Sequence, residues 1–420
     1  MTGKVPKGYK QTEVGVIPAE WEVVAIGNHI DFISGYPFKS DEFSQDSSKT
    51  KLLRGINITE GNLRWNPEID RYWSHVTPEL TRYLLDESDL VIGMDGSKVG
   101  RNYAQVKSTD LPLLLVQRVA RIRCLPSLFV EFLRHFVGSE FFTEYVDSVK
   151  TSSGIPHISA KQINEYTIPL PPLPEQKRIA EILSGVDATI ESTRKVIDQT
   201  KKVKQGLLQE LLTKGIGHTK FKDTEIGRIP AEWEVVRLGD MIDISSGFSP
   251  SNAALSSNGT IPFFKVNQLN DSSKYLVNSP FWHSDSGLFT LPAGAIIFPK
   301  RGASIFTNKI RILGIPGSFD TNLMATVPHE SLNNEYLYYW LDSYGLSRIA
   351  DTSSIPQINN KHISPLKFPL PPLPEQKKIA EILSSVDATI ESTRKVIDQT
   401  KKVKQGLMQD LLTGKVRVKV

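Results

Sequence analysis

The chain lacks the features that place a protein outside the cytoplasm or in a membrane. Its 420 residues include one cysteine, Cys124, which excludes a disulfide framework and a zinc site built on cysteines. No apolar run approaches the roughly 18 residues that a membrane span needs. The first residues, MTGKVPKGYKQ, do not have the apolar stretch of a secretory signal. We therefore expect a cytoplasmic protein with no membrane contact.

Motifs of common catalytic and metal sites are also missing. The sequence contains no GxxxxGK[ST] phosphate loop, no GxGxxG dinucleotide motif, no HExxH and no Asn/Asp-Pro-Pro-Tyr/Phe motif of adenine methyltransferases. The segment GMDGSKVG at residues 93–100 has the wrong spacing for a phosphate loop. The eight histidines are scattered without metal-ligand spacing. We expect no catalytic residues, no metal and no cofactor bound by this chain.

Excess charge of one sign is small, and it is unevenly distributed. The net charge is +4 in total, made up of −2 over residues 1–168, +3 over 169–220, −1 over 221–368 and +4 over 369–420. A protein that binds DNA by bulk electrostatics alone is normally more basic than these two nearly neutral regions. If the chain binds DNA, its positive charge is locally clustered or a partner supplies much of it.

A long internal repeat is the strongest positive feature. Residues 169–213 and 369–413 match at 41 of 45 positions, with a constant offset of 200. Solvent-type positions repeat as well as apolar ones, for example in ESTRKVIDQTKKVKQG. Either both faces of each segment make contacts, or the copies are recent duplicates.

Each copy predicts a long helix that needs a partner. The prolines of LPPLPEQ favour an extended approach, and Pro174 and Pro374 suit a first helical position. Apolar or small residues then recur at spacings of three and four, which is typical of a coiled-coil seam. Thr193, Thr200 and Lys204 weaken its middle. The apolar seam positions are Leu183, Val186, Ile190, Ile197, Leu207, Leu211 and their counterparts Leu383, Val386, Ile390, Ile397, Leu407 and Leu411.

Connectivity then predicts the architecture. A helix over residues 175–212 is about 57 Å long at about 1.5 Å per residue. Because the order is module, helix, module, helix, the two helices must run antiparallel if they pair. We expect an α+β protein: two globular mixed α/β modules separated by two long helices in an antiparallel coiled coil with pseudo-two-fold symmetry, both termini lying near the first module. The predicted domains are 1–168, 169–213 (central spacer helix), 214–368 and 369–420 (C-terminal spacer helix and tail).

The two modules share scattered blocks. TEVGVIPAEWEVVAIG at residues 12–27 matches TEIGRIPAEWEVVRLG at 224–239, and Asp31, Ser34 and Gly35 match Asp243, Ser246 and Gly247. Residues 89–96 resemble 294–302, and residues 155–163 resemble 355–363. Residues 90–92, 296–298 and 309–313 are predicted strands, and 129–137 and 335–341 predicted helices. We interpret the modules as one scaffold with different loops.

This pattern resembles the specificity subunit of Type I restriction–modification systems over nearly the whole chain. The resemblance is carried by IPAEWEVV and the following Ser-Gly, by the blocks TSSGIPHIS and TSSIPQIN, and by LPPLPEQK-IAEILS before each helix. It implies that each module is a target-recognition domain for half of a split double-stranded DNA site, and that the helices set the gap. It also implies a non-catalytic subunit that docks two modification subunits, and restriction subunits through the complex. The partners would use S-adenosylmethionine, ATP and magnesium.

Candidate DNA contacts are placed on the loops between shared blocks. Arginine and lysine suit guanine edges and phosphates, and asparagine suits adenine. In the first module the candidates are Tyr36, Phe38, Lys39, Arg54, Asp95, Ser97, Lys98, Arg101 and Arg118, which begins a series with Arg121 and Arg123. In the second they are Ser249, Lys265, Asn267, Lys300, Arg301, Ser304, Lys309 and Asn322.

Simpler interpretations stand beside each assignment. Any one of these cations is also explained as a solvated surface residue. Trp21 and Trp233 are expected in the core, and Lys201, Lys202 and Lys204 on a wet helix face or partner surface. Two other functions stay open: an architectural coiled-coil scaffold whose modules bind proteins, and a self-contained nuclease or methyltransferase with unrecognised motifs.

Overall fold

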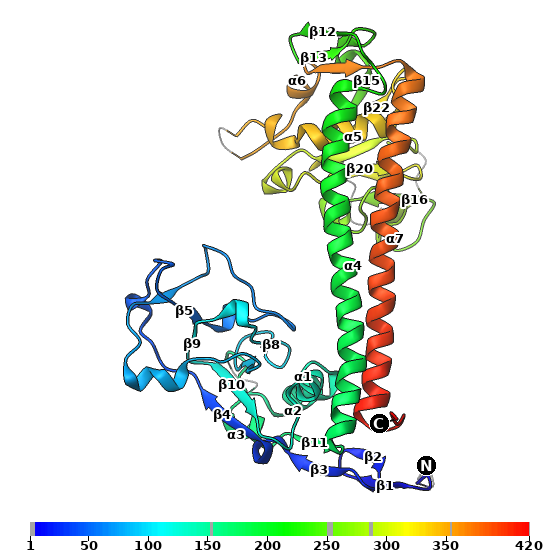
Figure 1. Ribbon diagram of the computed structural model, residues 1–420. Helices are drawn as coiled ribbons and strands as arrows, with labels where there is room; N and C mark the ends of the chain where they lie inside the picture. Colours follow the sequence, from blue (N-terminus) through cyan, green and yellow to red (C-terminus); the bar gives the residue numbers. More distant parts are fainter. Residues whose placement is uncertain (1–4, 152–153, 250–254, 285–288, 353–354, 420) are drawn as a thin grey trace. The chain divides into compact units, whose positions relative to one another are not determined.

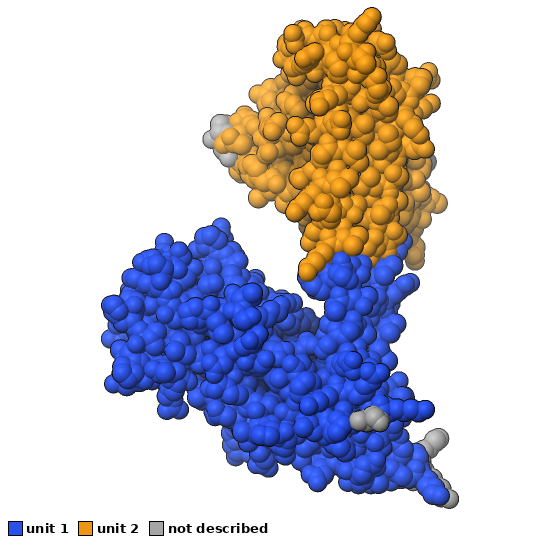
Figure 2. Space-filling view, viewed as in Figure 1, with its two compact units in different colours: residues 1–194, 395–420 blue, residues 195–394 orange. Residues whose placement is uncertain are grey.

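The computed structural model describes residues 5–151, 154–249, 255–284, 289–352 and 355–419. The chain forms two compact units (Figure 2): unit 1 contains residues 1–194 and 395–420, and unit 2 contains residues 195–394. Each unit therefore holds one globular module and half of each long helix. The serine pairs at 152–153 and 353–354, which belong to the two TSS blocks, lie outside the described residues.

The two repeats form the long helices α4, Leu173–Lys214, and α7, Leu373–Leu412 (Figure 1). The predicted helix over 175–212 is confirmed, and α4 extends it by two residues at each end. Pro174 and Pro374 stand at the second helical position, where a missing N–H costs no intrahelical hydrogen bond. In unit 1 Asp187 of α4 contacts Lys404 of α7, and in unit 2 Lys204 contacts Asp387. The two helices therefore pair antiparallel within each unit.

The seam between the helices is apolar at most of the predicted positions. Buried in both copies are Leu183, Ile190, Ile197, Leu211 and Leu383, Ile390, Ile397, Leu411. Val186, Leu207, Val386 and Leu407 are half-buried. Ile179, Leu208 and Leu212 are also buried, because the modules pack on the helix ends there. The seam is thus wider at the ends than the heptad pattern predicts.

The sequence predicts that Lys204 lies on a wet helix face or a partner surface. In the structure it lies between the two helices instead. Its side chain is 17% exposed, and its Nζ lies 2.7 Å from Asp387 Oδ1. The offset of 200 gives the same pair in unit 1, where Lys404 Nζ lies 2.6 Å from Asp187 Oδ1. A polar pair inside an apolar seam favours one register, since a shift separates the lysine from its aspartate. The lysine that appeared to weaken the seam therefore specifies its register.

Unit 1 builds its module from short strands and helices. Its strands are β1 Tyr9–Thr12, β2 Gly15–Pro18, β3 Glu22–Ala25, β4 Ile30–Ser34, β5 Thr50–Leu53, β6 Tyr72–Trp73, β7 Leu90–Gly93, β8 Tyr103–Gln105, β9 Leu113–Leu115, β10 Val119–Cys124 and β11 Thr167–Leu170. Its shorter helices are α1 Val130–Val137, α2 Glu140–Val149 and α3 Ala160–Asn164. The sheets have the strand orders β4-β10-β7-β8, β6-β5-β9, β1-β2 and β11-β3.

Unit 2 repeats much of that plan. Its strands are β12 Phe221–Thr224, β13 Gly227–Pro230, β14 Glu234–Arg237, β15 Ile242–Ser246, β16 Ile261–Phe264, β17 Tyr275–Leu276, β18 Trp282–His283, β19 Ile296–Pro299, β20 Arg311–Leu313, β21 Ser318–Phe319, β22 Leu323–Pro328 and β23 Lys367–Leu370, with helices α5 Asn334–Tyr344 and α6 Asn360–Ile363. Its sheets have the orders β15-β22-β19-β20-β17, β18-β16-β21, β12-β13 and β14-β23. The order β15-β22-β19 corresponds to β4-β10-β7, so the shared blocks form equivalent strands.

Each module shares one core with the helix ends. Trp21 and Trp233 are fully buried, as expected from the sequence. In unit 1 Trp21 belongs to a cluster that includes Leu183 of α4 and Leu411 of α7. In unit 2 Trp233 belongs to the equivalent cluster with residues of both helices. Burying large aromatic side chains at this junction ties each module to both helices.

The polar residues of LPPLPEQ also have structural partners. Gln176 Oε1 accepts a hydrogen bond from Phe129 N at 2.8 Å, and its amide donates to Pro171 O at 2.9 Å. Gln376 repeats this with Asn333 N at 2.8 Å and Pro371 O at 2.9 Å. Both glutamines are buried, so these bonds satisfy groups that water cannot reach. The same hydrogen bonds in both units therefore explain part of why polar residues are identical in the two copies.

The preceding glutamate binds a different chain segment in each unit. In unit 1 Glu175 accepts from Trp21 Nε1 at 3.0 Å and from Arg417 at 2.7 and 2.9 Å. Tyr9 also donates to the carbonyl of Gly414 at 3.1 Å, so strand β1 and the segment after α7 lie together.

In unit 2 Glu375 accepts from Trp233 Nε1 at 2.9 Å and from Ile216 N at 2.8 Å, and it lies 2.9 Å from His218 Nε2. The segment that follows α4 therefore takes the place that the C-terminal segment takes in unit 1. Among the residues that the structure describes, no helix is long and apolar enough to cross a bilayer.

Candidate nucleic-acid interface

In unit 1 a close backbone approach creates a turn in front of strand β10. A Cβ atom on Gly35 would lie 2.1 Å from the carbonyl oxygen of Val116, so only glycine permits this contact. The neighbouring Tyr36 forms a β-bridge with Val116. Arg118 adopts a left-handed conformation with φ of 64°, which reverses the chain into β10. Gln117 and Arg118 are exposed at this turn.

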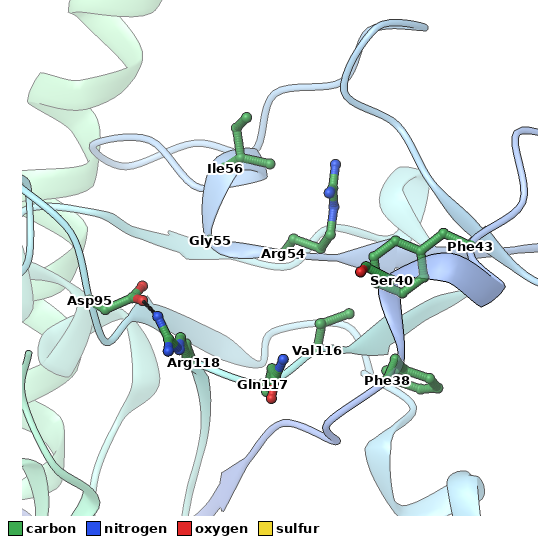
Figure 3. Close-up of a pocket in the computed structure, with 10 residues that line it drawn as sticks. All are labelled: Phe38, Ser40, Phe43, Arg54, Gly55, Ile56, Asp95, Val116, Gln117 and Arg118. Carbon is green, nitrogen blue, oxygen red and sulfur yellow. Dashed lines mark hydrogen bonds and ion pairs between the residues drawn. The ribbon is translucent and has the colours of Figure 1, made fainter. Parts of the chain in front are cut away.

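The turn borders a hollow of about 520 Å³ in the first module (Figure 3). Arg118 Nη1 donates to Asp95 Oδ2 at 2.8 Å, with side-chain exposures of 62% and 21%. The guanidinium is thus oriented by a carboxylate and still accessible. The hollow is lined by Phe38, Ser40, Phe43, Arg54, Gly55, Ile56, Asp95, Val116, Gln117 and Arg118.

Arg54 supplies a second cation to the hollow, and it is more constrained. Its Nη2 donates to the carbonyl of Ile69, and its guanidinium lies 5.7 Å from the ring centre of Phe43. Its Nε is buried without a hydrogen-bond partner among the described residues. Burial lowers the pKa of Arg54, although the group stays charged at neutral pH. The hollow therefore combines two arginines with an aromatic wall.

Other candidates of the first module separate into exposed and buried residues. Lys39 is exposed and lies 3.6 Å from Glu42. Phe38, a predicted DNA contact, is only 4% exposed, and its ring centre lies 4.6 Å from that of Trp73. The apolar ring is used in a local core rather than on the surface. Tyr36, Ser97, Lys98 and Arg101 are exposed.

The arginine series after Arg118 is structural. Arg121 is 3% exposed and pairs with Asp31. Arg123 Nε donates to Asp89 at 2.7 Å, and this partner raises the pKa of Arg123. Both arginines lie on β10, where Arg121 pairs with Asp31 of β4 and Arg123 pairs with Asp89 directly before β7.

Unit 2 repeats the close approach and the turn. A Cβ atom on Gly247 would lie 2.0 Å from the carbonyl oxygen of Asp320. Thr321 and Asn322 follow and are exposed, directly before strand β22. Asn322 N donates to Asp320 Oδ1 at 2.7 Å and its side-chain nitrogen to Oδ2 at 3.4 Å. Ser249, a predicted candidate, lies 3.4 Å from the hydroxyl of Thr321.

Two lysines of the second module are less accessible than the sequence suggests. Lys300 Nζ donates to Ser246 Oγ at 3.1 Å, and burial lowers the pKa of Lys300, partly offset by Asp320. Lys265 lies 3.9 Å above the ring of Phe281 and is half-buried.

The remaining candidates of the second module lie in or beside the 3-10 helices Val266–Asn270 and Ala303–Thr307. Ser304 Oγ donates to the carbonyl of Arg301 at 3.0 Å, and Lys309 donates to Asn270. Arg301 and Asn267 are exposed. Gln117, Asp320 and Thr321 are not among the predicted contacts, because no matching block around them marks their position.

The helices present a second exposed surface. Val196 and Val203 of α4 are 54% and 49% exposed, and Val396 and Val403 of α7 are 49% and 58% exposed. Each pair is spaced by seven residues, so both valines lie on one side of their helix. The sequence repeat gives both helices the same exposed apolar side chains at equivalent positions.

Contacts between module and helices also match across the two units. In unit 1 Arg134 lies 3.3 Å from Asp187, and His135 lies 3.1 Å from Ser184. His135 is 1% exposed, and burial, followed by the charges of Arg134 and Lys404, lowers its pKa well below the usual value.

In unit 2 the equivalent place belongs to Tyr339. Its hydroxyl donates to Asp387 at 2.7 Å and lies 3.2 Å from Ser384. Lys274 Nζ donates to Ser384 at 2.7 Å and to Glu335 at 2.9 Å. Both modules are therefore attached to the helix pair through polar networks.

Comparison with known proteins agrees with this two-part organisation. The family model described as "Type I restriction modification DNA specificity domain" matches residues 18–202 and again residues 230–402. The chain is 30% identical to the Type I restriction enzyme MjaVIII specificity subunit of Methanocaldococcus jannaschii, over 96% of this chain and 94% of that protein. It is 35% identical to the EcoAI specificity subunit of Escherichia coli over 47% of this chain and 33% of that protein.

Solved structures show the same fold at lower identity. A chain described as "Structural basis underlying complex assembly and conformational transition of the type I R-M system" superposes with a TM-score of 0.58 at 19% identity, covering 95% of this chain and 99% of that chain. The S subunit of a Type I restriction–modification system from M. genitalium gives a TM-score of 0.55 at 15% identity, covering 94% and 96%.

Proposed function

Because the chain belongs to the family of Type I restriction–modification DNA specificity subunits, we propose that its modules each recognise one half of an asymmetric, gapped DNA site. One observation carries this proposal: the two modules share strand order and the glycine-dependent turn, yet they expose different side chains there. Two modules with the same backbone scaffold but different exposed side chains are suited to two different half-sites. The chain itself catalyses nothing and binds no cofactor.

The helix pair sets the unread gap between the half-sites. Each helix is continuous from one module to the other, and polar pairs specify the same register at both places where the helices are paired. Inserting one turn of four residues into both helices should lengthen the gap by one or two base pairs while sparing the half-sites. An unchanged gap in that variant would refute the proposal that the helix pair sets the spacing.

The repeated helix surfaces dock two copies of one partner, the modification subunit. The exposed valines at 196, 203, 396 and 403 support this, because 41 of 45 positions repeat and both helices carry the same outward residues. The bound partners would supply S-adenosylmethionine-dependent adenine methylation and positive charge that the modules lack. Restriction subunits with ATP and magnesium join through that complex.

Methylation mapping tests the proposal directly. The chain is purified or expressed with its modification partners, and methylated adenines are mapped across a genome. We expect a single asymmetric motif in two parts; methylation at an ungapped palindrome would exclude the proposal. A protein-binding scaffold would give no sequence-specific footprint with partners present, and a self-contained enzyme would transfer methyl groups or cleave DNA alone.

Circular permutation tests the connectivity. The contact between Tyr9 and Gly414 supports joining the old ends, and residues 213–220 offer a place for new ones. The permuted chain should still assemble with its partners and methylate the same motif. A permuted chain that fails to fold would contradict this account of the ends.

A further inference from the structure

We propose that the turns at residues 116–118 and 320–322, each faced by one residue of a neighbouring segment, read bases of opposite half-sites. We name these the reading turns. The facing residue is Asp95 in the first module and Arg301 in the second. In the first module Arg118 reads a guanine, and in the second Asn322 reads an adenine. This inference rests on the proposed function, because it assigns residues to the two half-sites.

The backbone around the first reading turn is fixed by hydrogen bonds. Four of these bonds are Gly35 N to Val119 O (2.9 Å), Met94 N to Arg118 O (2.9 Å), Gly96 N to Pro156 O (3.0 Å) and Ile158 N to Met94 O (2.9 Å). An isolated bridge also pairs Asp95 with His157. Three chain segments distant in sequence therefore meet at this turn and hold it in one position.

The second module contains the same four bonds at equivalent residues. They are Gly247 N to Leu323 O (3.4 Å), Lys300 N to Asn322 O (2.9 Å), Gly302 N to Pro356 O (2.8 Å) and Ile358 N to Lys300 O (2.8 Å). The matching bridge pairs Arg301 with Gln357. The bonds confirm the match of Asp95 with Arg301 that the sequence blocks imply. They also establish two correspondences that sequence comparison does not reveal, Gln117 with Thr321 and Arg118 with Asn322.

The side chains at these equivalent positions differ in charge, although the backbone hydrogen bonds around them are the same. An acid in the first module stands where the second has an arginine, and Arg118 stands where the second has Asn322. Both turn residues are exposed, so their identity is not required by packing. A rigid scaffold that presents variable exposed side chains on a loop is the arrangement in which binding specificity is encoded.

The geometry of the first turn suits a guanine. Asp95 accepts from Nη1 of Arg118, which orients the guanidinium while 62% of the side chain stays exposed. Within the described residues, Nη2 and Nε of Arg118 donate no hydrogen bond to Asp95 or to another side chain. Two N–H groups in a fixed plane match the O6 and N7 acceptors of guanine. Figure 3 shows the pair at the edge of the hollow, beside Gln117.

The geometry of the second turn suits an adenine. Asp320 accepts from both the backbone N–H and the side-chain nitrogen of Asn322, which fixes the plane of the amide. One N–H of the amide and its oxygen are left to pair with N7 and N6 of adenine. Arg301 opposite the turn adds positive charge that favours a phosphate nearby.

The test uses the full chain in complex with its modification subunits. For Arg118→Ala, Arg118→Lys and Asn322→Ala, binding is measured against oligonucleotides in which every base pair of the wild-type motif is changed in turn. Arg118→Ala should lower discrimination at one G·C pair by about 5- to 150-fold, and Asn322→Ala should do so at one A·T pair. These two positions should lie in opposite half-sites. Arg118→Lys keeps the charge but not the rigid planar pair of N–H groups, so it should lose part of that discrimination.

Lys161→Ala is the control, because this side chain of the first module is 81% exposed and pairs only with Glu165 at 3.6 Å within the described residues. It should leave the profile unchanged. A uniform loss of affinity for Arg118→Ala, full discrimination in Arg118→Lys, or both effects in one half-site would overturn the inference. A wild-type motif without a gap would instead refute the proposed function; a gapped motif with unchanged variant profiles would refute only the reading turns.

Discussion

Replacing Lys204 by methionine tests whether the ion pair in the seam holds the helices in register. The lysine and Asp387 are 17% and 25% exposed and 2.7 Å apart. A surface pair contributes about 0–1 kcal/mol, whereas breaking a buried pair costs about 3–5 kcal/mol. For this mostly buried pair we expect a loss of about 2–3 kcal/mol, since methionine keeps the apolar stem but removes the cation that pairs directly with Asp387. The next cation, Lys274, donates to Ser384 and Glu335 instead of to this carboxylate.

The repeat provides a graded comparison for the same perturbation. In unit 1 Lys404→Met leaves Asp187 beside Arg134 at 3.3 Å, so a cation remains. We expect a smaller loss there, about 1 kcal/mol. Lys201→Met is the matched control: its side chain is 51% exposed and lies 3.4 Å from Asp198, so the change should be within about 0.5 kcal/mol.

Hydrogen exchange followed by mass spectrometry on the full chain measures these losses locally. Because a protein with two units is not expected to unfold in one step, peptides of residues 195–214 and 373–394 report unit 2 separately. For Lys204→Met, opening in these peptides should increase about 30- to 150-fold, the equivalent of about 2–3 kcal/mol. Equal effects of Lys204→Met and Lys201→Met would refute the role of the pair, and equal effects of Lys204→Met and Lys404→Met would refute the compensation by arginine.

Three further predictions concern a buried histidine, two glycines and the arginine that follows α7. Burial lowers the pKa of His135 below its value in the unfolded chain, so the side chain takes up a proton on unfolding. The protection of α1 against hydrogen exchange should therefore fall as the pH drops below about 6.5. After correction for intrinsic exchange rates, His135→Gln should show no such pH dependence. Gly35→Ala should abolish recognition of one half-site in methylation maps, because the new methyl collides with backbone, whereas Gly185→Ala, which meets nothing within 4 Å on a helix, should stabilise by up to about 1 kcal/mol. Arg417→Met should cost about 1–3 kcal/mol in the exchange of the first turn of α4, because it removes the charged partner of the buried Glu175; an unchanged rate there would contradict that role.

The long-range architecture could be predicted from the sequence because it repeats. Two copies of one helix, joined by a module, allow few arrangements, and the antiparallel pairing within each unit followed from connectivity. Lys204 was misinterpreted because a heptad pattern cannot distinguish a solvated lysine from one that meets an acid across the seam. That distinction depends on the register, which places Asp387 beside it.

The candidate interface was harder to predict because local sequence does not show which loop residues face outward. Phe38 follows Ser-Gly and was assigned to the surface, but the chain bends and buries its ring against Trp73. Arg121 and Arg123 were grouped with Arg118, yet they lie on a strand whose neighbours carry aspartates. Gln117 and Thr321 could not be aligned, because only backbone hydrogen bonds, not residue types, make them equivalent.

The near-identity of the two helices also affects how the chain reaches its native state. Since the lysine and aspartate of each pair are present on both helices, a helix from a second molecule satisfies the same contacts as the helix from its own. Side-chain specificity therefore does not select the partner; the effective concentration imposed by the connecting module does. Refolding at high protein concentration should accordingly yield domain-swapped dimers at the expense of monomer.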